Sequence, residues 1–553
     1  MKNFLYTFIL SLFILNLGYA DTNPAKHGMV VSVQELATEV GLNVLRDGGN
    51  AVDAAVAVGY ALAVVNPCCG NLGGGGFMTI HTAKGEDIVI NFREKAPLAA
   101  DQDFLLDKQG QVIPEKSRKG YTAVAIPGTV MGLDTALKKY GTLSRFQVME
   151  PAIQLAEQGF ILKPGDVKLL QFYAPKFKLE PSTTPIFLNQ NNPYQSGDRL
   201  IQTDLANSLK QIEKQGAAAF YQGDIAKEIV NASITHDGVF SLKDFNSYHA
   251  EIMKPLTCNY HGYHIISAPP PSSGGIALCE ILNILSPYTL KYHEAQSVHY
   301  MVEAMRHAFY DRNYELGDPD FVHNPTAILL SKDYAAAVRA TILPMQATQI
   351  KPNTTEQEGN QTTHYSVLDQ WGNAVSVTYT LNNFFGANRI AGHTGILLNN
   401  SMDDFTAKAN SENQFHLKEG TQNLIAPGKR PLSSMSPTIV TKNQRVVMII
   451  GSPGGPRIIT SILEAMLNVL DFNMPLQAAV DAPRFHQQWM PDLIYTEANT
   501  FDQKTQQALR LAGYQLKEDA PWGAVEAIYR KPQSFWIEGA NDRRRPMGAA
   551  LGY

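Results

Sequence analysis

The chain has 553 residues, of which 44% are hydrophobic and 18% charged, a composition typical of a globular protein with a large core. Its 46 lysines and arginines are set against 51 acidic residues, so no broad basic surface for nucleic acid is implied. The run Arg543-Arg544-Arg545 is short and is typical of a solvated turn or local ion pairs. The length alone corresponds to about three or four domains.

The first twenty residues resemble a secretory signal peptide. Lys2 supplies a positive start, residues 4–17 are nearly all apolar, and Gly18-Tyr19-Ala20 ends the segment in small residues suited to signal peptidase. The apolar run is shorter than the roughly 20 residues that span a bilayer, although an uncleaved anchor stays open as an alternative. We therefore predict an exported protein, periplasmic or secreted, that begins at Asp21 after processing.

The chain contains four cysteines: Cys68, Cys69, Cys258 and Cys279. An exported protein can oxidise them, but four in so long a chain do not make a disulfide scaffold. Cys68 and Cys69 are adjacent and lack the spacing of zinc ligands. We predict that all four are structural, and a Cys258–Cys279 bridge stays open. The sequence shows no histidine pair with zinc-helix spacing, and we expect no metal or organic cofactor.

Helical periodicity predicts a helix over 33–45, with Ser32 as its N-cap, and a second over 50–65, which is rich in alanine and valine as a buried helix is. Four consecutive glycines at 73–76 end this region. They lack the Lys-Ser/Thr pair of a phosphate-binding loop, so we predict tight backbone packing near a site. A hairpin is predicted over 77–92.

Further on, the sequence alternates predicted helices with polar connections. The segment before Thr362 is polar and aperiodic, which is typical of a linker. Helices are predicted from Pro127-Gly128 to Lys139 and over 145–158, 276–285 and 299–314, loop-like structure over 175–200, and the linker over 346–361.

Residues 362–382 have the pattern of a β-hairpin. Valine and tyrosine alternate with small and hydroxyl residues over 374–380, the period of a half-buried strand, and Gly372-Asn373 supplies the turn. If Asp369 pairs with Ala374, then Thr362 lies opposite Leu381, one position from Thr380. Two threonine hydroxyls would then meet at one strand end, beside Asn382.

A threonine hydroxyl is a weak nucleophile unless a base lies next to it. A threonine at a free chain terminus has such a base in its own α-amino group, whose ordinary pKa is about 7.7–8.0. Thr362 is internal, so this chemistry requires cleavage after Gln361. The pattern alone also fits a threonine-rich hairpin with no chemistry, because β-branched residues favour strands.

Several blocks in order along the chain decide between these interpretations. They resemble the signature of the γ-glutamyltranspeptidases, which are N-terminal nucleophile hydrolases, over essentially the whole chain after residue 20. The blocks are Asn71-Leu-Gly-Gly-Gly-Gly-Phe77, Phe92-Arg93-Glu94, Pro270-Pro-Ser-Ser-Gly-Gly275, the hairpin 362–382 with Phe385-Gly386, Pro431-Leu-Ser-Ser-Met-Ser-Pro437 and Gly451-Ser-Pro-Gly-Gly455.

The resemblance implies an α+β fold, a four-layer αββα sandwich built from two subunits of one precursor. These would be a large subunit, 21–361, and a small subunit, 362–553, that stay together as a heterodimer. The implied activity cleaves the γ-glutamyl amide of glutathione and related compounds through a γ-glutamyl-threonine ester. The group then passes to water or to amino acids and peptides.

The resemblance also implies roles for individual residues. Thr362 is the nucleophile, Thr380 orients it, and the amides of Gly454 and Gly455 form the oxyanion hole. Arg93, Ser433 and Ser434 would hold the substrate's α-carboxylate, which a planar guanidinium matches. The α-ammonium group would contact Asp404, Asn382 and Ser401, where bacterial relatives commonly have glutamine at the last of these positions.

Two other functions stay open at this point. The first is an acylase of the same fold acting on other amides, such as a cephalosporin acylase or a poly-γ-glutamate processing enzyme. A free α-amino acid head, as Arg93 and Asp404 imply, argues for γ-glutamyl compounds. The second is a ligand-binding paralogue that is not cleaved, but the hairpin around Thr362 shows no damage.

Residues 407–429 correspond to the family's lid over the site and carry Phe415 where many bacterial members have tyrosine. A tyrosine hydroxyl can hold a lid shut by hydrogen bonding, so we predict a looser lid and a larger share of hydrolysis relative to transfer. Phe415→Tyr should raise the transfer share, measured as the ratio of the two products at fixed acceptor concentration. An unchanged ratio would contradict this.

Overall fold

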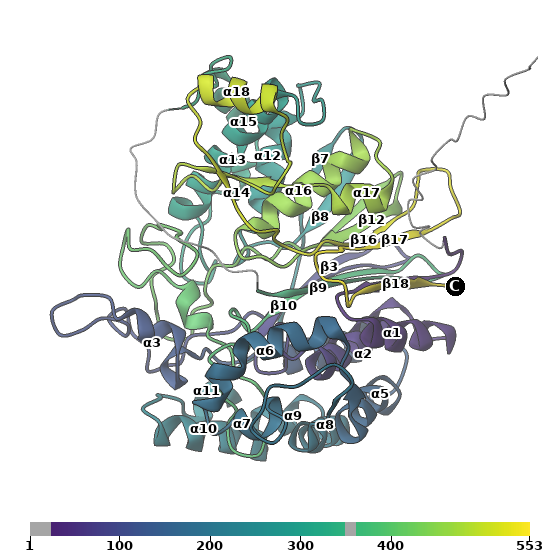
Figure 1. The fold of residues 1–553 in the computed structure, drawn as a ribbon, viewed down its shortest axis with the longest axis vertical. Coiled ribbons are helices and arrows are strands. Elements are labelled where there is room, and N and C mark those ends of the chain that lie inside the picture. Colours follow the sequence, from purple (N-terminus) through teal and green to yellow (C-terminus); the bar gives the residue numbers. More distant parts are fainter. Residues whose placement is uncertain (1–23, 349–360) are drawn as a thin grey trace, which may run out of the picture.

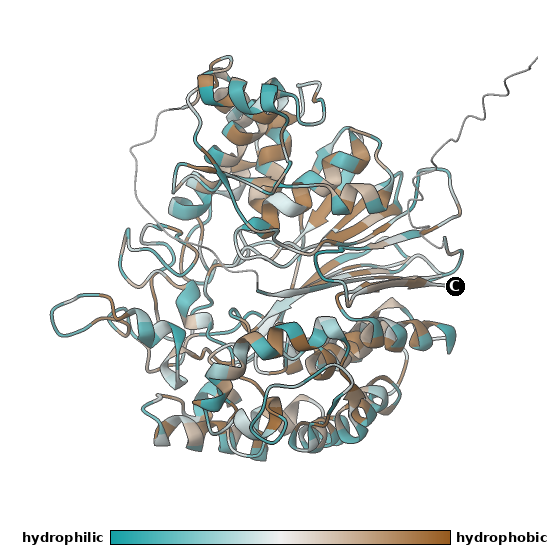
Figure 2. Ribbon diagram, viewed as in Figure 1, coloured by the Kyte–Doolittle hydropathy of each residue, from teal (hydrophilic) through white to brown (hydrophobic). Residues whose placement is uncertain are grey.

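The computed structural model describes residues 24–348 and 361–553. Two β-sheets pack face to face, and helices cover the outer face of each (Figure 1). Hydrophobic residues gather on the strands between the two helical layers (Figure 2). The prediction of an α+β fold with four αββα layers is confirmed.

The larger sheet combines strands from both sides of Gln361. Its described strands run in the order β18-β1-β9-β10-β2-β3-β6, and every neighbouring pair with a recorded register is antiparallel. The bounds are β18 (Ala549–Gly552), β1 (Met29–Ser32), β9 (Thr363–Leu368), β10 (Ala374–Thr380), β2 (Gly75–His81), β3 (Asp87–Asn91) and β6 (Glu251–Met253).

The smaller of the two packed sheets is shared in the same way. Its described strands are β17 (Glu538–Asn541), β16 (Glu526–Tyr529), β12 (Arg445–Gly451), β11 (Thr438–Lys442), β8 (Tyr263–Ser267) and β7 (Leu256–Tyr260), in that order. Two minor sheets lie outside the sandwich: β4 (Phe160–Ile161) with β5 (Arg199–Leu200), and β13 (Phe485–His486), β14 (Ile494–Thr496) and β15 (Leu516–Glu518).

One helical layer packs on the larger sheet through α1 (Glu35–Arg46), α2 (Ala51–Val65) and α4 (Thr129–Tyr140). Helix α2 is buried on all sides, as its alanine- and valine-rich sequence predicts. The rest of this side of the molecule holds α3 (Pro114–Arg118), the 3₁₀ turn η1 (Tyr121–Ala123), α5 (Arg145–Gln158), α6 (Pro164–Lys178), α7 (Thr184–Phe187), α8 (Thr203–Gln215), α9 (Ala217–Tyr221), α10 (Asp224–Thr235) and α11 (Leu242–Asn246).

The opposite layer packs on the second sheet through α12 (Gly274–Leu285), α16 (Arg457–Leu470) and α17 (Leu476–Asp481). Around them lie α13 (Ala295–Glu315), α14 (Thr326–Leu329), α15 (Lys332–Thr341) and α18 (Gln503–Leu511). A disulfide joins Cys258 on β7 to Cys279 on α12 and so ties this layer to its sheet, which settles the bridge that the sequence left open.

The space between the sheets is apolar at one end and polar at the other. A cluster that includes Met29, Val31 and Ile449 fills the apolar end. Towards the start of β9, hydroxyl groups of the larger sheet donate to carbonyls of the other: Thr79 to Pro437 at 2.8 Å and Ser376 to Ile450 at 3.2 Å. These bonds allow polar side chains to be buried between two sheets.

The hairpin of β9 and β10 differs from the prediction by one residue of register. Ala374 pairs with Leu368 and Tyr379 with Thr363, which sets Thr362 against Thr380 rather than Leu381. The reason is that the Asp369 carboxylate accepts the amides of Trp371, Gly372 and Asn373 at 2.9 Å each. Asp369 therefore belongs to the turn and not to the ladder.

The expectation that β10 is half-buried was also wrong. All seven of its residues are buried, because α2 covers one face and the second sheet covers the other. Alternate residues of β10 therefore face two different interfaces. Val375 and Tyr379 lie on the apolar side, and Ser376 and Thr378 lie on the polar side.

Local predictions were accurate where capping and periodicity agree. The helix over 145–158 has the predicted bounds, and Asn50 caps α2 through a reciprocal bond with Asp53. The predicted cap of the first helix was wrong, because Gln34 and not Ser32 accepts the opening amide. The segment 175–200 contains the end of α6 and all of α7.

Two sequence predictions fall mostly on residues outside the described ranges. The signal segment 1–20 lies outside them entirely, and so does the linker except at 346–348 and Gln361. Within 24–348 and 361–553, no helix combines the length and apolarity needed to cross a membrane.

The glycine loop before β2 packs against backbone on both sides, as its sequence predicts. A Cβ on Gly73 would lie 2.0 Å from the carbonyl oxygen of Leu397, and one on Gly74 would lie 1.9 Å from that of Thr380. Backbone atoms cannot rotate away as a flexible side chain can. The loop therefore fixes the end of β10.

We expect Gly74→Ala to lower the free energy of unfolding by about 1–3 kcal/mol, because the methyl group overpacks against the strand. Thermal and denaturant unfolding of the purified protein would measure this. Gly420→Ala is the matched control, since its Cβ would meet no backbone atom closer than 3.6 Å. Equal stability of the two variants would contradict the role of the loop.

Candidate active site

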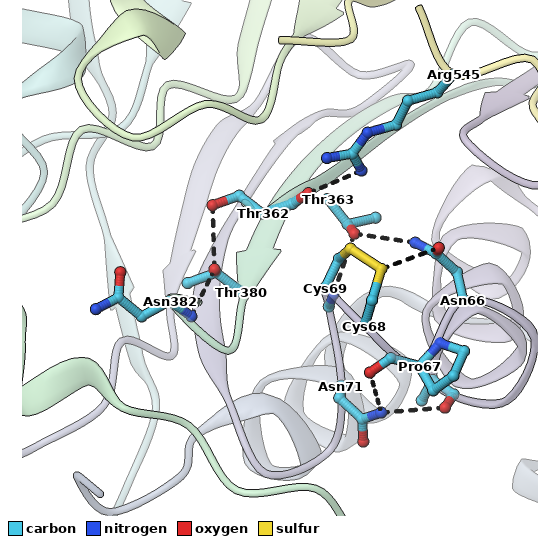
Figure 3. The surroundings of a disulfide bond; sticks show 12 residues. Asn66, Pro67, Cys68, Cys69, Asn71, Thr362, Thr363, Thr380, Asn382 and Arg545 are labelled. Carbon is cyan, nitrogen blue, oxygen red and sulfur yellow. Dashed lines mark hydrogen bonds between the residues drawn. A yellow bond between two sulfur atoms is a disulfide. The ribbon is translucent and has the colours of Figure 1, made fainter. Parts of the chain in front are cut away.

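The two threonines at the open end of the hairpin lie side by side. Thr362 precedes β9 and Thr380 ends β10, and their Oγ1 atoms are 3.0 Å apart (Figure 3). The amide of Asn382 donates to Thr380 Oγ1 at 2.8 Å. Because that oxygen already accepts one bond, the Thr380 proton is available to Thr362 Oγ1.

The carbonyl before Thr362 is held by the loop between β12 and α16. The amide of Gly454 donates to Gln361 O at 2.9 Å. Gly454 and Gly455 have φ angles of +128° and +55°, which other residues rarely adopt, and these angles turn the loop's backbone towards the threonines. A donor in this position polarises a carbonyl for attack.

Thr362 itself has a φ angle of +96°, which is exceptional for a β-branched residue. Such a conformation costs about 1–3 kcal/mol and persists only where surrounding contacts hold it. Arg545 supplies one such contact by donating to Thr362 O at 3.1 Å. Burial lowers the pKa of the Arg545 guanidinium to about 10, which still leaves it charged at neutral pH.

Arg93 follows β3 and reaches the site from the larger sheet. It is 1% exposed, contacts Asp404 through Nη2, and donates to Glu94 Oε2 at 2.8 Å and to Pro431 O at 3.3 Å. The adjacent carboxylates keep the guanidinium charged, and they raise the pKa of Arg93 against the opposing effect of burial. Glu94 is a site residue to which sequence reasoning gave no role, although it stands in the same motif.

Asp404 ends the 3₁₀ turn η2 (Ser401–Asp404) and faces Arg93. Burial raises the pKa of its carboxyl to about 7, although Arg93 opposes the shift. Ser401 of the same turn is fully buried and donates to Glu94 Oε1 at 2.8 Å. It supports Arg93 through Glu94, and it is not among the side chains that line the cavity beside the threonines.

One small cavity of about 30 Å³ brings most of the predicted residues together. Its walls include Thr362, Thr380, Asn382, Arg93, Asp404, Ser433, Ser434 and Gly455. Gln361, Gly454 and Ser401 stand just outside these walls. The sequence gave no site role to Arg312 or Asn413, which also line the cavity and come from α13 and from the lid segment 407–429.

The lid closes this cavity through Phe415. Its ring lies against Gly455, where a Cβ would come within 2.9 Å of it, and its carbonyl accepts from Gln488 at 3.0 Å. The cavity holds about one water molecule in this state. This position of the lid leaves little room for a substrate beside Thr362.

Among the described residues, no three histidine, cysteine or acidic side chains gather as metal ligands. Buried His364 bonds to Thr378 at 2.9 Å and Ser366 at 3.1 Å between the strands, and burial lowers its pKa to about 3. A neutral histidine in that position is a structural residue.

A threonine that follows a polarised carbonyl, directly before a central strand of an αββα sandwich, is typical of the class of N-terminal nucleophile hydrolases. Comparison with known proteins agrees. The γ-glutamyltranspeptidase family profile matches residues 37–552. A glutathione hydrolase proenzyme of Pseudomonas sp. strain A14 is 51% identical, with 98% of both chains covered.

A second relative, the glutathione hydrolase proenzyme of Escherichia coli K12, is 43% identical over 96% of this chain and 92% of its own. Among solved structures, a cephalosporin acylase from Bacillus halodurans superposes with a TM-score of 0.87 at 26% identity, with 99% of both chains covered. The chain belongs to the γ-glutamyltranspeptidase family.

The raised pKa of Asp404 predicts how substrate binding depends on pH. If Asp404 binds the substrate's ammonium group, as the family resemblance implies, binding needs its carboxylate form, which is lost as pH falls through about 7. As pH falls from about 8 to about 5, we expect KM for a γ-glutamyl anilide to rise. Below the pKa of Asp404 the rise should approach tenfold per pH unit. Initial rates over this range would measure it.

Asp404→Asn should raise KM at every pH and remove this dependence, because an amide does not titrate. A glutaryl anilide, which lacks the ammonium group, is the matched control and should show no such rise in the wild-type protein. A flat KM profile for the γ-glutamyl substrate would contradict the assignment.

Proposed function

We propose that this chain cleaves itself between Gln361 and Thr362 and then uses Thr362 to hydrolyse and transfer γ-glutamyl groups. The observation that supports this most directly is the Gly454 amide on the Gln361 carbonyl. In the uncut chain the bond to be broken already lies against a candidate oxyanion hole, with the attacking hydroxyl beside Thr380.

Self-cleavage follows from this geometry in two steps. Thr362 Oγ attacks the carbonyl carbon of Gln361, the C–N bond breaks, and the nitrogen takes a proton as an ester forms. Water then hydrolyses the ester, leaving a carboxylate on Gln361 and a free amino group on Thr362. The strained φ of Thr362 favours the first step, because cleavage releases it.

The same groups serve the catalytic cycle. The free amine of Thr362 accepts the proton of its own hydroxyl as Oγ attacks the substrate's γ-carbonyl, and the amides of Gly454 and Gly455 stabilise the oxyanion. The leaving amine takes the proton, and a γ-glutamyl ester remains. Water or the amino group of an acceptor then attacks the ester.

Recognition of the substrate's α-amino acid head follows from the Arg93–Asp404 pair. These side chains contact each other in a nearly dry site. A zwitterionic head can replace that contact with two, its carboxylate on Arg93 and its ammonium on Asp404, with Ser433 and Ser434 at the carboxylate and Asn382 at the ammonium group. Glutathione and other γ-glutamyl compounds have such a head.

The processed protein would consist of residues 21–361 and 362–553. Both sheets contain strands from each piece, so the two remain one folded unit after the cut. We further propose that the protein is exported to the periplasm or secreted, with amino acids and short peptides as acceptors.

An acylase function is the second candidate, because a cephalosporin acylase shares the fold over the whole chain. The two functions differ in whether the substrate carries a free α-amino acid head. Comparing γ-glutamyl anilide with glutaryl anilide separates them, since only the first can satisfy both Arg93 and Asp404.

Thr362→Ala should leave the chain uncut and lower turnover at least about a thousandfold, because it removes the one hydroxyl that is the nucleophile in both self-cleavage and turnover. A denaturing gel, N-terminal sequencing of the smaller piece and a γ-glutamyl anilide assay would measure this. Thr82→Ala, in the turn between β2 and β3, is the control and should be cut and active. An active, unbroken Thr362→Ala chain would overturn the proposal.

A further inference from the structure

A disulfide joins the neighbouring residues Cys68 and Cys69 in the loop between α2 and β2 (Figure 3). Both cysteines are buried. The bond closes a small ring that includes the peptide link between them, so it restricts the direction of the Cys68 carbonyl and the position from which the Cys69 carbonyl extends. The sequence predicted structural cysteines here, but not this bond.

The backbone carbonyl groups of Cys68 and Cys69 hold the segment that follows β10. Cys69 O accepts the amide of Leu381, and Cys68 O accepts that of Phe385, both at 2.7 Å. Between these two anchors lies Asn382, whose amide donates to Thr380 Oγ1. The ring therefore holds the segment that orients the Thr380 hydroxyl.

The residues on either side of the ring hold the start of β9. The amide of Gly70 donates to Thr363 Oγ1 at 3.0 Å, and Asn66 Nδ2 donates to the same oxygen at 3.3 Å (Figure 3). Thr363 directly follows Thr362, so these two bonds fix the point from which the nucleophile extends. Thr380 is thus positioned by the ring through Asn382, and Thr362 is positioned by the residues next to the ring through Thr363.

We propose that the Cys68–Cys69 disulfide is a positioning element for Thr362 and Thr380, and that its reduction by a small thiol slows turnover. This inference rests on the proposed role of Thr362 as nucleophile. The disulfide touches no reacting atom and acts through Thr363 and Asn382.

Reduction changes a specific contact as well as opening the ring. Two thiol molecules supply two electrons and two protons, the Cys68–Cys69 bond breaks, and the reductant leaves as its own disulfide. Asn66 Oδ1 lies 3.4 Å from Cys68 Sγ, which has no proton while oxidised. A Cys68 thiol can donate there while Asn66 Nδ2 still donates to Thr363 Oγ1, so the amide keeps its orientation and the loss of positioning comes from opening the ring.

A cavity lies against the loop that carries this bond. It has a volume of about 440 Å³, and both cysteines form part of its wall together with Phe384, Phe385 and Leu170. It also reaches Arg545, which donates to Thr362 O. No residue of the lid segment 407–429 lines this cavity.

The test uses the processed protein carrying Cys258→Ala and Cys279→Ala, in which the neighbouring pair is the only disulfide that remains. Dithiothreitol is added, the peptide containing residues 68–69 is alkylated and weighed, and γ-glutamyl anilide, which has no thiol, reports the rate. We expect two alkylated thiols and little change in KM. We also expect kcat to fall about fivefold, which corresponds to the loss of one hydrogen bond. Reoxidation should restore kcat.

Three further variants separate positioning from general loss of structure. Cys68→Ala/Cys69→Ala should show the lower kcat and no response to dithiothreitol. Thr363→Val should show a lower kcat and a smaller response, because the contacts of Cys68 and Cys69 with the segment after β10 remain, whereas Thr363→Ser should retain both rate and response. Alkylation of the pair without reductant would overturn the inference. So would an opened disulfide with unchanged kcat, or an effect confined to KM.

The outcomes also distinguish this inference from the proposed function. If Thr362→Ala retains activity, the nucleophile assignment fails whatever the disulfide does. If Thr362→Ala is inactive and the reduced protein keeps its full kcat, only the positioning role fails.

Discussion

The hydrogen bond from Gly454 to the Gln361 carbonyl joins the two sheets at the bond that we propose is cut. Gly454 follows β12 of one sheet, and Gln361 leads into β9 of the other. This contact exists only because the sheets pack face to face at that end, where hydroxyl-to-carbonyl bonds replace apolar packing. Processing and catalysis therefore depend on one inter-sheet geometry, used first on the chain and then on the substrate.

Charge is concentrated at the other side of the same cavity. Burying Arg93 is costly, and Glu94 and Asp404 offset that cost by pairing with it. Ser401 supports the arrangement through Glu94 rather than facing the cavity. Burial raises the pKa of the Asp404 carboxyl to about 7, so it is close to its titration point at neutral pH. Two carboxylates share the one guanidinium of Arg93, and a substrate ammonium group would supply a second positive charge.

Two buried segments hold Thr362 and Thr380 in place. The glycine loop fixes the end of β10 through close backbone contact, and the cysteine ring fixes the segments after β10 and at the start of β9. Phe415 covers the front against Gly455. Thr362 is thus held by these buried segments and covered by a lid segment whose Phe415 lies against Gly455.

The sequence by itself determined the helices with clear caps, the glycine loop, the fold class and the family, because these depend on local patterns and on motifs in order along the chain. It did not determine the hairpin register, since the Asp369 carboxylate takes three turn amides and shifts the ladder by one residue. Nor did it reveal the burial of both faces of β10, the turning of Ser401 towards Glu94 or the Cys68–Cys69 ring. The burial of β10 and the contact of Ser401 with Glu94 depend on which segments, hundreds of residues apart, come into contact, and the Cys68–Cys69 bond depends on how the loop after α2 is folded; only the tertiary structure decides these.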